Sequence, residues 1–251
     1  PWVNRYIGNP ILSGMTRIFF RTRLSDIHCG MRGFTQEAYK KMNLRTLGME
    51  FASEMVVAAL TNNLRIREIP INYHSRYGDS KLVPFYDAWR HVRFMLLYSP
   101  LWLYFIPALI GFVPGMFFLL LLSGGPVILF GHYWDIHFLI FSSALTILSY
   151  QIMNLGVFAH VFAINEGFIK KDRFTAAFQR HFNLEKGLII GVFLFLVGFV
   201  INFLIFLEWF SKHFEALHRI RESVLALTLL VIGVQTVFAS FFISLLTFKR
   251  K

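Results

Sequence analysis

The chain has 251 residues, of which 56% are hydrophobic and 30 are Phe, and its formal net charge is +11. Such a composition excludes an ordinary soluble domain, and the long apolar runs indicate an integral membrane protein. The single cysteine, Cys29, excludes an internal disulfide and a cysteine-based zinc cluster. Because basic residues flank the apolar runs, we expect contact with anionic lipid headgroups and no nucleic-acid partner.

The first elements in chain order suit a small α/β domain. Residues 11–24 have apolar positions at helical spacing with arginines between them, which predicts an amphipathic helix that either packs on its own domain or lies among lipid headgroups. Residues 34–44 predict a second helix with Thr35 as its N-cap. Residues 48–64 predict a third helix that ends at Asn62 and Asn63, and residues 65–74 alternate like a strand.

A polar loop and an aromatic, basic helix come next. The loop, residues 74–82 (HSRYGDSKL), carries Arg76, Ser80 and Lys81 around Gly78. A guanidinium, a hydroxyl and an ammonium suit a phosphate, although a solvated turn is the alternative. In residues 84–100 aromatic and basic side chains are mixed directly before an apolar run, which is typical of an interfacial helix.

Four apolar stretches are long enough to cross a bilayer as helices: residues 101–123, 137–163, 187–207 and 224–248. The loop after the second stretch and the C-terminal tail are basic, so both termini are expected in the cytoplasm. The third loop is also basic, and residues 210–222 could form an interfacial helix on the far side. Gly191 and Gly198 could pair spans laterally, which leaves a homo-oligomer as one interpretation. His160 lies inside a span and could be functional, although a packing histidine hydrogen-bonded to a neighbouring helix is the more common explanation.

The predicted fold class is therefore an α/β domain followed by an α-helical membrane domain. The expected boundaries are residues 1–83 for the α/β part, which includes the first interfacial helix, 84–99 for the second interfacial helix and 100–251 for four transmembrane helices. Since Pro1 is not an initiator Met and no signal-peptide pattern follows it, we expect the chain to be the C-terminal portion of a longer protein.

Two further stretches could carry chemistry. In residues 25–34 (SDIHCGMRGF), Gly30 and Gly33 permit tight backbone geometry around Arg32, and Asp26 could pair with that arginine or cap the local turn. A structural turn with an internal ion pair and a functional loop are equally compatible with the pattern. Glu50 and Glu54 share one helix face and could position an acceptor or a sugar, or could be solvated or paired with arginine. No D-x-D, P-loop, GxGxxG or HExxH pattern occurs, so this chain holds no sequence-evident metal site.

Taken in order, RYIGN, SDIHCGMRGF, GMEFASEM, REIPINY, SRYGDSKL and WRHVRFMLLYSP resemble the family 2 polyprenyl-phosphate glycosyltransferases, the group of the dolichyl-phosphate mannose and glucose synthases. The resemblance covers about residues 1–100. It implies the C-terminal part of a GT-A domain with interfacial amphipathic helices. The implied reaction transfers a sugar from a UDP- or GDP-linked donor to the phosphate of a polyprenyl lipid at the cytoplasmic face.

Carried over by position, the resemblance places Arg76, Ser80 and Lys81 at the donor diphosphate, with Arg76 and Lys81 as catalytic. It places Arg5 and Asn9 at the lipid phosphate, and Gly30 at a turn glycine. The residues Asp26, Arg32, Glu50 and Glu54 are then acceptor-side or structural. A divalent cation, Mg²⁺ or Mn²⁺, is expected to have its ligands in an N-terminal half that precedes Pro1, so this chain alone is expected to be inactive.

Two other functions fit part of the pattern. A non-catalytic scaffold or lipid-carrier flippase partner could derive from a transferase. A processive polysaccharide synthase would need a Q-x-x-R-W motif, which the chain lacks. A bare four-helix transporter is disfavoured because the spans contain few ionisable groups.

Overall fold

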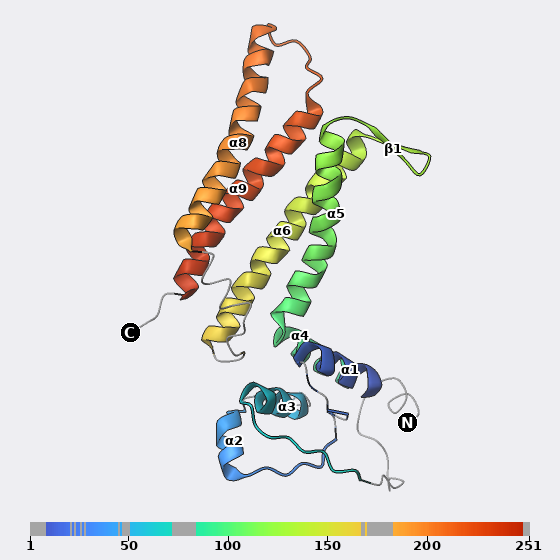
Figure 1. Ribbon diagram of the computed structural model, residues 1–251, viewed down its shortest axis with the longest axis vertical. Coiled ribbons are helices and arrows are strands. Elements are labelled where there is room, and N and C mark those ends of the chain that lie inside the picture. Colours follow the sequence, from blue (N-terminus) through green and yellow to red (C-terminus); the bar gives the residue numbers. More distant parts are fainter. Residues whose placement is uncertain are drawn as a thin grey trace. The chain divides into compact units, whose positions relative to one another are not determined.

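The computed structural model describes residues 9–20, 22, 24–25, 27, 29–44, 46, 51–71, 84–166, 169 and 183–247. The chain divides into two compact units. The N-terminal unit comprises Pro1–Ser99 and Gly167–Lys170, and the membrane unit comprises Pro100–Glu166 and Lys171–Lys251. Figure 1 shows the helices of both units in sequence colours.

The N-terminal unit contains four described helices: α1 (Asn9–Phe20), α2 (Gln36–Met42), α3 (Phe51–Thr61) and α4 (Pro84–Leu97). The predicted N-cap is confirmed, because the Thr35 hydroxyl accepts a hydrogen bond of 3.1 Å from the backbone N–H of Ala38. The predicted exit of α3 is confirmed as well. Asn62 and Asn63 form a turn there, and Asn63 adopts a left-handed φ of 50°, which asparagine tolerates better than most residues.

The core of this unit lies between α1, α3 and α4. Buried Val57, Phe94 and Met95 form its centre, and Met15 and Phe19 of α1 pack against them. The hydroxyl of buried Thr16 donates a 2.8 Å hydrogen bond to the Met95 sulfur. Two amphipathic helices therefore bury their inner faces against each other and against α3.

The predicted strand at residues 65–74 is wrong over its described part. Residues 64–71 form neither helix nor strand, and the strands found among the described residues are those of a hairpin in the membrane unit. Alternating polarity yields a strand only where a neighbouring strand supplies ladder hydrogen bonds. Here the segment is held by Glu68, whose carboxylate accepts hydrogen bonds from the backbone N–H (2.9 Å) and the hydroxyl (2.9 Å) of Ser25.

The membrane unit contains four helices long and apolar enough to cross a membrane. They are α5 (Ile106–Ser123), α6 (Ile136–Asn165), α8 (Leu184–Ser211) and α9 (Ile220–Thr247). The four predicted spans are thereby confirmed, and α6 and α8 extend a few residues beyond the ends expected for them. A π-helical turn, η2 (Leu101–Phe105), precedes α5. Pro107 lies just after it and lacks the N–H that an α-helix would direct to Leu103.

Glycines allow a close approach between α8 and α9. A Cβ atom at Gly198 would lie 2.7 Å from the Ala226 carbonyl oxygen, and one at Gly233 would lie 2.6 Å from the Phe195 nitrogen. Gly191 is similarly enclosed, with the Gly233 carbonyl 2.9 Å from the position of a Cβ. Small residues let helix backbones pack closely in a membrane. Gly191 and Gly198 thus serve contacts within the chain, whereas the sequence had suggested lateral pairing between copies.

Hydroxyl groups join α6 to α9. The side chains of Ser143 and Thr228 lie 2.7 Å apart, and those of Tyr150 and Thr236 lie 2.6 Å apart. The two threonine hydroxyls also donate to the carbonyl four residues earlier in α9, Thr228 to Val224 (2.8 Å) and Thr236 to Ile232 (2.7 Å). Buried polar groups are satisfied in this way where no water reaches them. His160 is buried on α6, in line with its interpretation as a packing residue.

Two connections lie at the same end of the bundle (Figure 1). The first is a hairpin of β1 (Val127–Leu129) and β2 (His132–Trp134) between α5 and α6. The second, residues 212–219, joins α8 to α9 and contains no helix, so the interfacial helix expected at 210–222 is wrong. The two long helices instead take up both ends of that stretch, since apolar residues at 210 and 220 extend their lipid-facing surfaces.

Candidate functional site

Six of the predicted site residues lie outside the described residues. These are Arg5, Asp26, Glu50, Arg76, Ser80 and Lys81. Asn9 is the first residue of α1. Gly30, Arg32 and Glu54 are described, and two of them meet at one place, the first turn of α3.

Arg32 fastens the loop that precedes α2 to this turn. Its guanidinium donates to three backbone carbonyls: Cys29 (2.9 Å), Ala52 (2.5 Å) and Ile27. Guanidinium N–H groups that are bonded to carbonyl oxygens are not available to bind a phosphate. The structure therefore gives Arg32 a positioning function in the described part of the chain, the structural alternative that the sequence had left open.

Ser53 and His91 join the same turn to α4. The Ser53 hydroxyl lies 2.8 Å from Nδ1 of His91, and both side chains are buried. Sequence reasoning missed this pair, because His91 had been counted only among the basic residues of an interfacial helix. His91 precedes the buried Phe94 and Met95 by three and four positions and so lies on the inner face of α4, and that spacing was the available signal.

Glu54, the next residue, binds a third segment. Its carboxylate accepts hydrogen bonds from the backbone N–H (2.9 Å) and the hydroxyl (2.7 Å) of Thr46. The side chain is buried, so Glu54 is not the solvated surface carboxylate that the sequence had allowed. Its place in the first turn also suits a negative charge at a helix N-terminus.

Three consecutive residues of α3, Ala52, Ser53 and Glu54, thus hold three different segments. We call this the α3 hub: Ala52, Ser53 and Glu54 with Arg32, His91 and Thr46. Its groups are hydrogen-bonded in pairs, and Ser53, Glu54 and His91 are buried, which is the pattern of a support that fixes loops. The hub holds residues 29–32 and residue 46 in place, and each of these lies close in sequence to a predicted site residue, Asp26 or Glu50.

The local backbone does not require glycine at Gly30 or Gly33. Neither has a positive φ, and a Cβ atom at either position would meet nothing within 4 Å. Glycine is required where φ is positive or where another group approaches closely, and neither condition holds here. Residue 30 lies in a bend, and neither its φ nor a neighbouring group requires glycine there.

The outer faces of α1 and α4 are exposed and amphipathic. On α4 the exposed stripe consists of Tyr86, Trp89, Arg93 and Leu97, and half-buried Arg90 lies over the Tyr86 ring at 5.6 Å. On α1 it includes Ile11, Arg17 and Ile18. Aromatic and basic side chains on one face match the chemistry of a bilayer interface.

No group of three or more His, Cys, Asp or Glu side chains that could hold a metal ion occurs among the described residues. The ligands of the divalent cation that the resemblance implies are expected before Pro1, so no chemistry of that cation is derived from the described residues.

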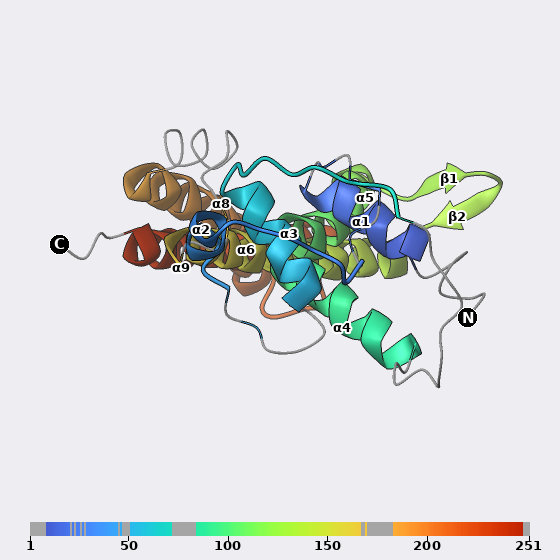
Figure 2. The same cartoon turned by 90° about the horizontal axis from the view of Figure 1, so that it is seen from below.

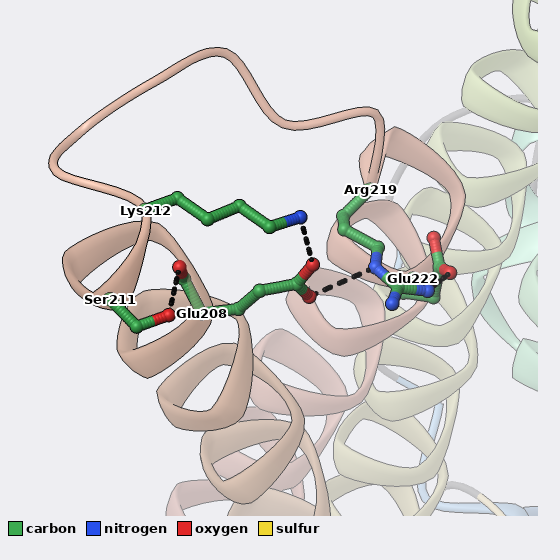
Figure 3. A network of polar contacts seen from close by, with 5 residues as sticks. All are labelled: Glu208, Ser211, Lys212, Arg219 and Glu222. Atoms are coloured by element: carbon green, nitrogen blue, oxygen red, sulfur yellow. Dashed lines mark hydrogen bonds and ion pairs between the residues drawn. The ribbon is translucent and has the colours of Figure 1, made fainter.

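At the hairpin end of the membrane unit the charges are paired. Figure 3 shows Glu208 accepting from Lys212 (2.8 Å) and Arg219 (3.1 Å), while Arg219 also donates to Glu222 (3.0 Å). These partners, Glu222 first and then Glu208, raise the pKa of Arg219. Arg221 forms an ion pair with Asp135 and donates to the Leu122 carbonyl (2.8 Å). All three cations at the α8–α9 connection therefore have a carboxylate partner.

Two comparisons with known proteins find similarity to this chain. Residues 157–247, from α6 to the end of α9, match the family described as the glycosyltransferase family 2 C-terminal transmembrane region. Over 241 residues, 96% of the chain, the sequence is 37% identical to the low-salt glycan biosynthesis hexosyltransferase Agl6 of Haloferax volcanii. The chain spans 58% of the length of that relative. No solved structure matches the chain significantly. The predicted relationship to the family 2 glycosyltransferases is confirmed by these two matches.

Proposed function

We propose, from this relationship to the family 2 glycosyltransferases, that the full-length protein transfers a sugar from a UDP- or GDP-linked donor to the phosphate of a polyprenyl lipid at the cytoplasmic face of the membrane. One observation carries the proposal: 96% of the chain is similar to a hexosyltransferase of glycan biosynthesis. Because the chain spans 58% of that relative, the activity is proposed for the whole protein and not for this chain alone.

A lipid acceptor is supported by the helices of both units. The membrane unit has four helices that could cross a bilayer. In the N-terminal unit, α4 exposes Trp89 and Arg93 and ends at Leu97, just before Pro100, where the membrane unit begins. A domain tethered in this way stays close to the bilayer surface, where the phosphate of a long isoprenoid lipid lies.

The chemistry proposed for the site is charge neutralisation and alignment. A lipid monophosphate is already anionic, so it needs little help from a general base. Arg76, Ser80 and Lys81 are proposed to bind the donor diphosphate, and Arg5 and Asn9 the lipid phosphate. Fixed cations would reduce the repulsion between the two phosphate groups and stabilise the departing diphosphate. Mg²⁺ or Mn²⁺, bound by residues outside this chain, remains part of the proposal.

The α3 hub suggests how the acceptor side could be organised. Glu54 is engaged by Thr46 and Arg32 by three carbonyls, so we assign both to positioning rather than to substrate contact. Asp26 and Glu50, which lie close to these residues in sequence, remain the proposed acceptor-side groups.

The proposed orientation places both chain termini and the α6–α8 connection in the cytoplasm. That connection and the first turn of α8 carry five cations, Lys170, Lys171, Arg173, Arg180 and Lys186, whereas the α8–α9 connection and the first turn of α9 carry three. The positive-inside rule counts basic residues near the spans, and the larger count favours the cytoplasmic side. The pairing of Lys212, Arg219 and Arg221 with carboxylates provides a structural reason for cations on the other side.

The test is a transfer assay on full-length protein in membranes. Radiolabelled nucleotide sugars are supplied in turn with a polyprenyl phosphate, and the organic extract is scored for a single-sugar lipid. A lipid-extractable product with one donor supports the proposal. A water-insoluble polymer would identify a processive synthase instead, and no product from any donor would favour a non-catalytic scaffold.

A further inference from the structure

The β1–β2 hairpin presents an uncharged, aromatic tip to its surroundings. Phe130 is 94% exposed, Ile128 71% and Tyr133 65%. Residues 124–134 contain no Lys, Arg, Asp or Glu. Large apolar side chains exposed together in one place mark an interaction surface.

The two faces of the hairpin differ. Val127 is paired with Trp134, and both pack on the buried cluster of Leu119, Leu122 and Leu139. Trp134 also stacks on Phe118, with ring centroids 5.5 Å apart. The neighbouring pair, Ile128 and Tyr133, must point to the opposite face because side chains alternate along a strand. The base of the hairpin is thus fixed to the bundle, while its other face and its tip are exposed.

The turn at the tip of the hairpin places Phe130 in a strained backbone conformation. Phe130 and Gly131 join Leu129 to its partner His132, and both have positive φ, 53° and 76°. Turns of this kind favour Asn, Asp or Gly at the first position, and a bulky residue there is strained. The Phe130 side chain is almost fully exposed, so no burial of its apolar surface within the chain offsets this strain.

The position of the hairpin indicates what it contacts. It connects α5 and α6, two helices able to cross a membrane, so it lies where the chain leaves the bilayer. In both views the hairpin extends sideways from the end of α5 and α6, across the direction of the helices and away from the bundle (Figures 1 and 2). On α5, Phe117 and Leu120 are exposed, so the lipid-facing surface of the bundle continues to the base of the hairpin.

We propose that the β1–β2 hairpin is an interfacial anchor, with Ile128, Phe130 and Tyr133 inserted into the headgroup region of the leaflet at this end of the bundle. Lipid then covers the exposed face and the tip of the hairpin. Uncharged aromatic side chains prefer this depth, and the neighbouring polar groups, His132 and the Tyr133 hydroxyl, can reach water. The anchor is independent of the proposed sugar transfer, and it would fix the α5 end of the bundle in depth and rotation.

Site-directed fluorescence tests the proposal in the full chain. Cys29→Ser removes the single cysteine, and Phe130→Cys or Tyr133→Cys then carries an environment-sensitive NBD label. The control label is at Glu215→Cys, an exposed position in the other connection at the same end. Each protein is reconstituted in phosphatidylcholine vesicles with and without lipids that bear a nitroxide near the headgroup.

The hairpin labels are expected to show blue-shifted emission and quenching by the nitroxide lipids at least about twofold stronger than the control label, as befits the interfacial depth of aromatic anchors. The control should be quenched better by iodide in the water. Iodide quenching of both hairpin labels equal to that of the control would overturn the proposal. So would efficient disulfide cross-linking between two copies of the unlabelled Phe130→Cys variant, because the face would then be a protein contact. Two label positions keep the test decisive if one variant misfolds.

Discussion

Nδ1 of His91 lies 2.8 Å from the hydroxyl oxygen of Ser53, and the two buried side chains join α4 to the first turn of α3. Removing the hydroxyl with Ser53→Ala leaves a buried ring nitrogen without this partner. We expect a loss of about 1–3 kcal/mol in the stability of the N-terminal unit, the usual cost of an unsatisfied buried polar group. Thermal unfolding in detergent or nanodiscs measures it. Lys40→Ala, at an exposed position of α2, is the control, and equal midpoints for both variants would contradict the prediction.

Arg221 is expected to join the two helical hairpins of the membrane unit. It forms an ion pair with Asp135 at the start of α6 and donates to the last turn of α5 at Leu122. In a double-mutant cycle with Arg221→Met and Asp135→Asn, we expect a coupling energy of about 0.5–3 kcal/mol. Arg221→Met should be the more damaging single change, because it also removes the bond to the carbonyl. The more exposed Lys212→Met is the matched control, and additive effects of the first two variants would exclude the coupling.

The α8–α9 contact should not tolerate even one added methyl group. Gly198→Ala places a Cβ 2.7 Å from a backbone oxygen of α9, so the two helices must move apart. Overpacking of this kind costs about 1–3 kcal/mol. The measurement is the thermal midpoint in nanodiscs together with the yield of inserted protein. Gly124→Ala is the control, since a Cβ at that position meets its nearest atom only at 4.0 Å. Equal behaviour of the two alanine variants would show that the close approach is not needed.

Much of the fold could be predicted because its determinants are local. The spans follow from length and composition, and the cap at Thr35 and the exit at Asn63 follow from residue types with a specific backbone chemistry. The hairpin at 127–134 escaped prediction because its turn, Phe130–Gly131, lacks the Asn-Gly or Asp-Gly signal. The strand expected at 65–74 failed because its alternation needs a pairing partner, which no described residue supplies.

The α3 hub could not be read from the sequence for a different reason. Ser53 and His91 are 38 positions apart, and Arg32 and Ala52 are 20 apart. No periodic pattern links such pairs, so only tertiary packing brings them together. The glycosyltransferase relationship, in contrast, depended on the order of several short motifs, and that order needs no knowledge of contacts.

The exposed stripe of α4 is predicted to lie in the headgroup region. In a Cys29→Ser background, an NBD label at Trp89→Cys should be quenched by nitroxide lipids, while one at Tyr39→Cys on α2 should be quenched by iodide in the water. The two aromatic positions are matched, because Trp89 is 55% and Tyr39 50% exposed. They differ in that Trp89 has Arg93 one turn away and lies on a helix that leads into the first span. Identical quenching profiles would mean that α4 has no special relation to the bilayer.

The last prediction concerns the loop at residues 74–82. If Arg76 and Lys81 bind the donor diphosphate, then Arg76→Ala and Lys81→Ala in the full-length protein should each lower the rate of sugar transfer by about 10²–10³-fold, the effect of removing one charge-stabilising donor. Arg76→Lys should recover little of the activity, because an ammonium cannot replace the planar pair of guanidinium donors. Arg67→Ala, at an exposed position in the same unit, controls for the loss of a positive charge. Each variant must first reach the membrane at normal levels, which an immunoblot of the membrane fraction establishes. Near-normal transfer by both alanine variants would remove the loop from the mechanism, while the family relationship, which rests on similarity over 241 residues, would stand.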